Sequence, residues 1–155
     1  SLLNKHEIHF DVLGYGMKKN EFQDYIQNEN LTYVNLHEPT TREKSLQLIK
    51  NSHVSIAFLN DEEVFSTVLP GKVIDYMTCQ TPIVAGVKGV AANIIHQHQT
   101  GYAIETTELA PIVEKVLELR DNPELLANMK KNCLKVIQTE FLWEHNIEKI
   151  VDIMK

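Results

Sequence analysis

The sequence has few cysteines and no long apolar run. Its 155 residues include only Cys79 and Cys133, which are too few for the disulfide framework of a small secreted protein. No stretch reaches the roughly 18 consecutive apolar residues of a membrane-spanning helix, because Lys88 and Asn93 interrupt the most apolar region. The N-terminal residues lack the basic and then apolar layout of a secretory signal. These absences predict a cytoplasmic protein that does not span a membrane.

Positive charge is also scarce. Lys and Arg total 15 against 21 Asp and Glu, so the formal net charge is −6. A protein that binds nucleic acid needs a basic stripe to neutralise the phosphates, and this sequence has none. We therefore expect no nucleic-acid partner.

Motifs for metal binding are missing as well. The sequence contains no Cys-x-x-Cys, and His96 and His98 are spaced so that a helix would point them to different sides. Zinc ligands on one helix are instead spaced i,i+4. We expect neither a metal nor any other cofactor.

Strand and helix patterns alternate along the chain. Such alternation is typical of βαβ units, and it predicts an α/β fold with a doubly wound parallel sheet and helices on both faces. Length and composition fit one domain over residues 1–155. The predicted strands cover residues 7–13, 31–35, 53–58, 83–85 and 102–104.

The segment from residue 66 to residue 89 is the most informative. Leu69-Pro70-Gly71 breaks the preceding structure, and Lys72 then opens an apolar-periodic helix. The first N–H groups of a helix have no partner within it and carry partial positive charge, so they favour a bound phosphate. Lys72 adds a full charge, and Asp75 lies one turn further on, where it could accept from a sugar hydroxyl. The alternative is an ordinary solvated Lys72–Asp75 pair worth about 0.2–0.5 kcal/mol.

Other candidate residues follow the predicted strands. Gly14-Tyr15-Gly16 follows the first strand, residues 36–39 follow the second, and residues 86–89 follow the fourth. Ligands of doubly wound sheets bind outside the carboxyl ends of the strands, so one shared site is expected there. Gly86 and Gly89 are equally explained as turn residues.

The region around Lys72 resembles the nucleotide-sugar-binding motif of retaining GT-B glycosyltransferases, the family 4 or group 1 type. Residues 70–85 read P-G-K-V-I-D-Y-M-T-C-Q-T-P-I-V-A, which is closest to a bacterial variant with P-S-K-x-x-E-Y. Shorter resemblances occur in the order of the family: D-V-L-G-Y-G at 11–16, V-S-I-A-F at 54–58, G-Y-A-I at 101–104, D-N-P-E-L at 121–125 and F-L-W-E at 141–144.

The resemblance implies roles for individual residues. Asp75 stands at the second acid of the family's E-x7-E motif and would bind the ribose, while Lys72 would hold the diphosphate. The first acid, which contacts the donor sugar, is replaced by Thr67, which puts that catalytic role in doubt. The remaining nucleotide-sugar-binding candidates are Leu69, Pro70 and Gly71 in the loop, Gly14 and Gly16 in the first turn, His37 within the base-contacting segment 36–38, and Lys88.

The resemblance also implies that parts of the enzyme are missing. The family's C-terminal domain starts with one more strand and helix, which carry further diphosphate-binding cations, and its N-terminal domain holds the acceptor. We therefore interpret residues 1–155 as a partial, Rossmann-like C-terminal donor-binding domain, one GT-B half without its first strand-helix unit. We expect this fragment to be inactive alone.

The expected enzyme transfers a sugar from a nucleotide donor, a UDP-sugar, to a glycan or lipid-linked acceptor in cell-envelope polysaccharide synthesis. The resemblance implies no metal requirement and a peripheral position at the inner face of the membrane, reached through the full-length protein. Two alternatives stay open. One is a non-catalytic nucleotide-binding or interaction module, which Thr67 favours, and the other is a domain like that of an epimerase acting on UDP-linked amino sugars.

Overall fold

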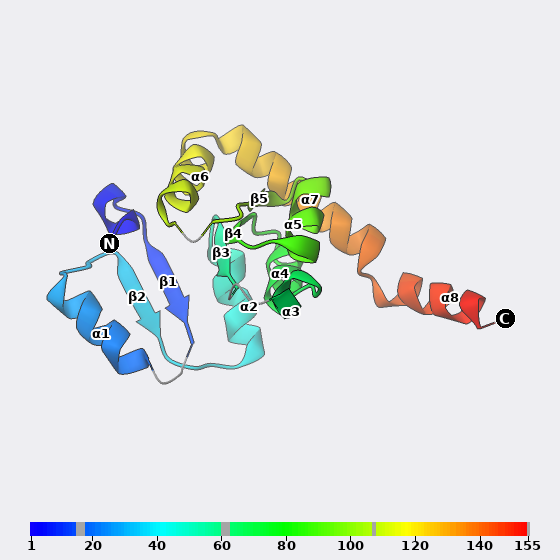
Figure 1. The fold of residues 1–155 in the computed structure, drawn as a ribbon, viewed down its shortest axis with the longest axis horizontal. Coiled ribbons are helices and arrows are strands. Elements are labelled where there is room, and N and C mark those ends of the chain that lie inside the picture. Colours follow the sequence, from blue (N-terminus) through cyan, green and yellow to red (C-terminus); the bar gives the residue numbers. More distant parts are fainter. Residues whose placement is uncertain (15–17, 60–62, 107, 155) are drawn as a thin grey trace. The chain divides into compact units, whose positions relative to one another are not determined.

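The computed structural model describes residues 1–14, 18–59, 63–106 and 108–154. The chain divides into two compact units, Ser1–Ser45 (unit 1) and Leu46–Lys155 (unit 2). Strands and helices alternate in both units, as the sequence predicts (Figure 1).

Unit 1 is built on a parallel strand pair. A short 3₁₀ helix, η1 (Leu3–His6), precedes β1 (Phe10–Leu13), and α1 (Lys19–Asn28) leads to β2 (Val34–His37). The register runs from Phe10 opposite Val34 to Leu13 opposite His37. Both predicted strands exist but begin three residues late. Glu7 and Asn30 adopt left-handed backbone conformations, with φ of 57° and 50°, so the chain turns before each strand can start.

Unit 2 contains a parallel sheet of three strands in the order β3-β4-β5. These are β3 (Ser55–Phe58), β4 (Ile83–Gly86) and β5 (Gly101–Ala103). All four residues of the central strand β4 are buried, as expected for a parallel sheet covered on both faces.

Helices cover both faces of this sheet. Val73 and Met77 of α4 (Gly71–Thr78), Ile95 of α5 (Gly89–Gln97) and Cys133 of α7 (Pro123–Glu140) form one core with Ile83 of β4. Val84 points to the opposite face because side chains alternate along a strand, and α6 (Ala110–Asp121) contacts β4. The predicted doubly wound arrangement is therefore confirmed in this unit.

The remaining helices are α2, α3 and α8. The helix α2 (Arg42–Asn51) begins after Thr41, whose Oγ1 accepts the Lys44 N–H at 3.4 Å. A short helix, α3 (Glu63–Ser66), lies between β3 and α4, and α8 (Trp143–Ile153) follows α7. Within the described ranges, no helix is long and apolar enough to cross a membrane.

The strand pairing differs from the prediction in one respect. The sequence predicts one parallel sheet, whereas the hydrogen bonds form a two-stranded sheet, β1-β2, and a three-stranded sheet, β3-β4-β5.

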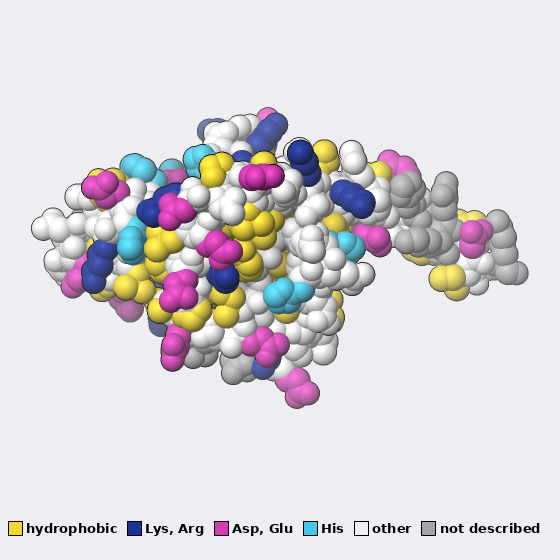
Figure 2. Space-filling model, turned by 90° about the horizontal axis from the view of Figure 1, so that it is seen from above, with side chains coloured by type: hydrophobic (Ala, Val, Ile, Leu, Met, Phe, Trp, Pro, Cys, Tyr) yellow, Lys and Arg dark blue, Asp and Glu magenta, His cyan; other side chains and the backbone are white. Residues whose placement is uncertain are grey.

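On the face drawn in Figure 2, acidic and basic side chains are intermixed and form no stripe of one sign.

Candidate functional site

The start of α4 is where the sequence predicts it. Pro70 is the N-cap residue of α4 in an extended conformation, with φ −66° and ψ 138°, and within the described residues no side chain caps the helix. Val73 N–H donates to Pro70 O at 2.9 Å, and Val73 and Met77 anchor the helix with fully buried side chains. Gly71 and Lys72 therefore present the positive end of α4, which favours an anion.

Lys72 projects from the first turn of α4 and is exposed. Among the residues that the structure describes, it forms no hydrogen bond and no ion pair. The ordinary surface pair with Asp75, the alternative to a ligand site, is therefore not formed. The exposed ammonium group is therefore accessible to another partner.

Asp75 lies half-buried in the middle of α4, one turn after Lys72. Burial raises the pKa of its neighbour Tyr76 above the ordinary value, and the charge of Asp75 raises it further. The Tyr76 hydroxyl donates to Ile56 O on β3 at 3.3 Å. This hydrogen bond joins α4, which carries Asp75, the residue predicted to bind the ribose, to the neighbouring strand β3.

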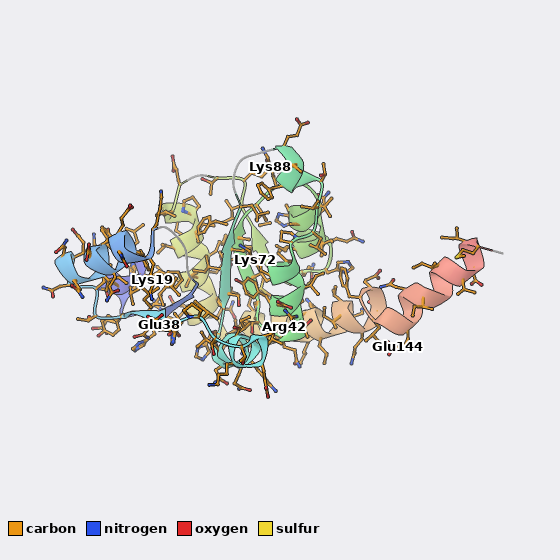
Figure 3. The ribbon with its side chains drawn as sticks, turned by 90° about the horizontal axis from the view of Figure 1, so that it is seen from below. Lys19, Glu38, Arg42, Lys72, Lys88 and Glu144 are labelled. Carbon is orange, nitrogen blue, oxygen red and sulfur yellow. The ribbon has the colours of Figure 1, made fainter. Side chains whose placement is uncertain are left out.

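A second helix begins in the same way. Lys88 is the N-cap residue of α5 in an extended conformation, with φ −128° and ψ 176°, and its side chain makes no capping hydrogen bond. The two helices precede and follow β4. In a parallel sheet with helical crossovers, both N-termini therefore lie at the edge formed by the carboxyl ends of the strands. Lys72 and Lys88 come from these two helix starts (Figure 3).

Gly89 brings the end of α3 against the start of α5. Its φ is +67°, and a Cβ at this position would lie 2.0 Å from Ser66 O. Thr67, the next residue after Ser66, is therefore held near the start of α5. Its Oγ1 donates to Val64 O at 2.9 Å, so the position of the family's first acid holds a neutral hydroxyl.

The other loop residues of the prediction also lie at the start of α4. Leu69 and Pro70 are half-buried, and Leu69 packs against the core. Gly71 is exposed, and a Cβ there would meet nothing within 4 Å. The loop is thus anchored on one side and open on the other.

Unit 1 carries the remaining candidates. Gly14 follows β1 in open space, since a Cβ there would meet nothing within 4 Å. Gly16 lies outside the described residues. His37 ends β2, and its Nε2 is 2.7 Å from Asp11 Oδ1 on β1, which also accepts from Asn35 Nδ2 at 3.1 Å.

These contacts set the charge state of Asp11. Partial burial is the largest single effect and acts to raise its pKa, but the hydrogen bonds from His37 and Asn35 and the charges of His37 and His9 together bring the pKa below the ordinary value. The sequence interpretation missed this pair. Asn35 and His37 are two residues apart, so their side chains lie on the same face of β2 and could have indicated a shared partner. Which residue of β1 is that partner depends on the register of β1 against β2.

A second polar contact lies beside His37. Lys19 Nζ on α1 is 2.6 Å from Glu38 Oε1 and 2.7 Å from Oε2. This bidentate ion pair joins the start of α1 to the residue that follows β2. In the described part of the chain, no group of three or more His, Cys, Asp or Glu side chains is arranged to hold a metal ion.

The chain resembles known proteins both in sequence and in fold. The sequence profile of the family described as glycosyl transferases group 1 matches residues 1–136. The chain belongs to this family. A comparison with curated protein sequences finds no match.

Several chains of solved structures are similar to this one, and one of them illustrates the shared fold. It is a mutant of TarM from S. aureus in complex with fondaparinux, α-GlcNAc-glycerol and UDP, with a TM-score of 0.72 and 21% sequence identity. The match covers 93% of this chain and 28% of that one. The chain therefore spans less than a third of the length of the TarM structure.

Proposed function

We propose that the chain is the donor-binding part of a retaining glycosyltransferase that uses a nucleotide-sugar, and specifically a UDP-sugar. The observation that carries this proposal is the pair of helix N-termini, α4 and α5, which have no side-chain cap among the described residues and which both lie at the carboxyl edge of the sheet. Membership of the group 1 family supports it. The UDP bound in the similar TarM structure supports a UDP-sugar as the donor.

The diphosphate would lie at the start of α4. The N–H groups of Gly71 and Lys72 and the Lys72 ammonium would bind it there, and Lys88 adds a second cation at the start of α5. Negative charge grows on the diphosphate as the sugar departs, so donors already oriented towards it lower the barrier. Asp75 would accept from the ribose hydroxyls and fix the nucleotide.

Unit 1 would supply the base-binding segment. The backbone at residues 36–38 would contact the base and Gly14 the nucleotide. The Asp11–His37 contact and the Lys19–Glu38 pair hold the end of β2 in a defined position for this role. The side chains of His37 and Glu38 thus position the backbone in this scheme and do not need to touch the ligand.

Residues 1–155 form a partial C-terminal domain in this proposal, and the acceptor, a glycan or a lipid-linked sugar, would bind a domain outside it. The full-length protein would act in cell-envelope polysaccharide synthesis, in the cytoplasm and peripherally at the inner face of the membrane. Neither a metal nor another cofactor has a role in this scheme. The isolated chain binds the donor but does not turn it over.

A non-catalytic nucleotide-binding module is the second candidate. The observation that favours it is Thr67, whose hydroxyl donates to Val64 O at the position where the family carries an acid. Transfer by the full-length protein would exclude this candidate. Binding without turnover would support it, and isomerisation of a UDP-sugar without acceptor would instead indicate an epimerase.

The binding test uses thermal shift of residues 1–155 with UDP, GDP and ADP. We expect stabilisation by UDP that Lys72→Ala and Asp75→Ala each abolish. Lys131→Ala is the matched control because Lys131 is exposed on α7, away from the carboxyl edge of the sheet. An equal UDP response in all four proteins would place the nucleotide elsewhere and refute the proposed site.

A further inference from the structure

A polar groove, the α5–α7 groove, lies at the edge of the sheet opposite to the starts of α4 and α5. The helix α5 begins at the carboxyl edge and runs back along the sheet, so its last turn lies at the amino edge. Two backbone hydrogen bonds fix this position: Ile83 N–H, at the start of β4, donates to Thr100 O, and Thr100 N–H donates to Ile95 O, each at 3.1 Å. The groove is bounded by residues 97–99 and by α7, which all belong to unit 2.

The α5–α7 groove has a volume of about 550 Å³, which lies within the roughly 300–1,000 Å³ of small-molecule sites. Its most buried lining residue is Val136, of which 2% is exposed. Asn132 Nδ2 on α7 donates to Gln99 O at 3.1 Å and ties the turn after α5 to α7. The two walls are therefore joined, and a ligand would bind a groove that is already formed.

Most side chains around the groove can both donate and accept hydrogen bonds. They are three amides, a hydroxyl and an imidazole, from Gln97, Gln99, Asn132, Thr139 and His98. Within the described ranges, the side chains of Gln97, His98 and Gln99 make no hydrogen bond, and the amide oxygen of Asn132 accepts none. His98 and Asn132 are half-buried. The groove therefore offers several polar groups that the protein itself does not satisfy.

The charges around the groove are balanced. Lys135 and Glu140 contribute one charge of each sign, and in the part of the chain that the structure describes neither forms an ion pair. The last carbonyls of α5 add partial negative charge, which disfavours a phosphate. Among the described residues, no Phe, Tyr or Trp lines the groove, so a nucleobase would find no ring to stack on. These features favour a neutral ligand rich in hydroxyl groups.

We propose that the α5–α7 groove is a second carbohydrate-binding site, which holds a neutral saccharide segment of the acceptor glycan. Each sugar hydroxyl donates one hydrogen bond and accepts others, as the amide, hydroxyl and imidazole groups of the groove also do. The identification of this glycan as the acceptor rests on the proposed function, whereas the binding of a saccharide does not.

The position of the groove suits a polymeric acceptor. The helix α5 has nine residues, and at about 1.5 Å per residue the groove lies roughly 13 Å from the helix start that follows Lys88. A long glycan can occupy the groove and the reaction centre together, which raises its overall affinity without a new contact at either place. A monosaccharide can occupy only one of them. The groove would therefore favour long acceptors over short ones.

The first test is nuclear magnetic resonance of residues 1–155 with three neutral trisaccharides: maltotriose, cellotriose and N-acetylated chitotriose. We expect at least one of them to shift the side-chain amide signals of Gln97, Gln99 and Asn132 and to leave the backbone signals of Gly71 and Lys72 unchanged. UDP should do the reverse. If none of the sugars shifts the amides of the groove, the second site is refuted, whatever UDP does. A missing UDP response would refute the donor site alone.

A pair of glutamine variants tests the groove directly. Gln97→Ala removes an exposed side chain of the groove, and Gln138→Ala is the matched control because Gln138 is exposed on α7 but does not line the groove. We expect Gln97→Ala to weaken trisaccharide binding by about twofold to tenfold, the effect of one lost hydrogen bond, and Gln138→Ala to leave it unchanged. Equal affinities in the two variants would contradict the site.

Kinetics of the full-length protein test the acceptor assignment. With a polymeric acceptor, we expect Gln97→Ala to raise the KM for the acceptor by a similar factor and to leave kcat and the KM for the donor unchanged. With a monosaccharide acceptor, it should change nothing. An unchanged KM for the polymer, or an equal rise for both acceptors, would overturn the assignment. A full-length protein that transfers no sugar would refute the proposed function, and with it the acceptor, but not saccharide binding in the groove.

Discussion

Gly89 packs directly against the backbone of Ser66. The contact joins the first residue of α5 to the last residue of α3, and a Cβ on Gly89 would come within 2.0 Å of Ser66 O. Gly89 also has a φ of +67°, which side chains disfavour. Two independent constraints therefore require glycine at the helix start that carries Lys88.

Replacement of Gly89 should destabilise unit 2. Gly89→Ala forces both an unfavourable backbone conformation, at about 1–3 kcal/mol, and a displacement of α3 from α5. The measurement is the free energy of unfolding in urea. Gly71→Ala is the matched control because a Cβ there meets nothing within 4 Å, and alanine suits a helix better than glycine. Equal losses in the two variants would show that the contact is not specific to Gly89.

Lys72 should contribute to binding through the diphosphate and not through the nucleoside. Removal of a charge-assisted hydrogen bond costs roughly 1.5–3 kcal/mol, so Lys72→Ala should weaken UDP binding by about tenfold to a hundredfold. The stability of the free protein should stay within about 0.5 kcal/mol, because Lys72 is exposed. Calorimetric titration with UDP and with uridine measures the difference.

Two controls accompany Lys72→Ala: a ligand without phosphate and a variant of a different exposed lysine. Uridine has no phosphate, so its affinity should be the same for Lys72→Ala and for the unsubstituted chain. Lys131→Ala should bind UDP normally. If Lys72→Ala weakened uridine and UDP equally, the ammonium would contact the nucleoside, and the diphosphate would have to bind elsewhere.

The Asp11–His37 contact should appear in the titration of Asp11. The pKa of Asp11 lies below its ordinary value because the hydrogen bonds from His37 and Asn35, together with the charges of His37 and His9, outweigh the effect of burial. A carboxyl whose pKa is lower in the folded state stabilises the protein above its unfolded pKa, and this contribution is lost as the pH falls through the folded pKa. Because the side chain of Asp11 is 31% exposed, the contribution is screened by solvent.

Removal of His37 should raise the pKa of Asp11. With His37→Ala, the burial effect is opposed only by the Asn35 hydrogen bond and by the charge of His9, so the carboxyl carbon should titrate at higher pH by nuclear magnetic resonance. Asn35→Ala should produce a smaller shift in the same direction, since a neutral amide donates one weaker hydrogen bond at 3.1 Å. An unchanged titration in His37→Ala would show that the pair is not formed in solution.

The sequence predicted the features that depend on neighbouring residues better than the features that depend on contacts between distant residues. The start of α4 follows from Pro70 and Gly71, which break the chain where the apolar periodicity begins, and the structure confirms it. The starts of β1 and β2 could not be derived, because they depend on left-handed turns at Glu7 and Asn30. The division into two sheets was equally hidden, since strand pairing depends on contacts distant in sequence.

The site shows the same division. Lys72 and Asp75 could be identified because one helix sets their spacing, and the uncapped helix start follows from the same local pattern. The contact of Gly89 with Ser66 and that of His37 with Asp11 join residues that are 23 and 26 positions apart. The residue pattern within one helix or strand gives no information about such contacts. Only the tertiary structure therefore shows which glycine and which histidine are constrained.

The two cysteines should differ sharply in reactivity. Burial raises the pKa of the Cys133 thiol to about 12, and its side chain is enclosed in the core between α7 and the sheet. Cys79 is partly exposed at the end of α4. A disulfide reagent at about pH 8 attacks only the thiolate, so we expect one thiol to react in the folded protein and the second only on unfolding. Cys79→Ala should remove the fast phase and leave the slow one. If the folded Cys79→Ala variant reacted at once, Cys133 would be open to solvent, and the packing of α7 against Met77 and Ile95 would be looser than the structure shows.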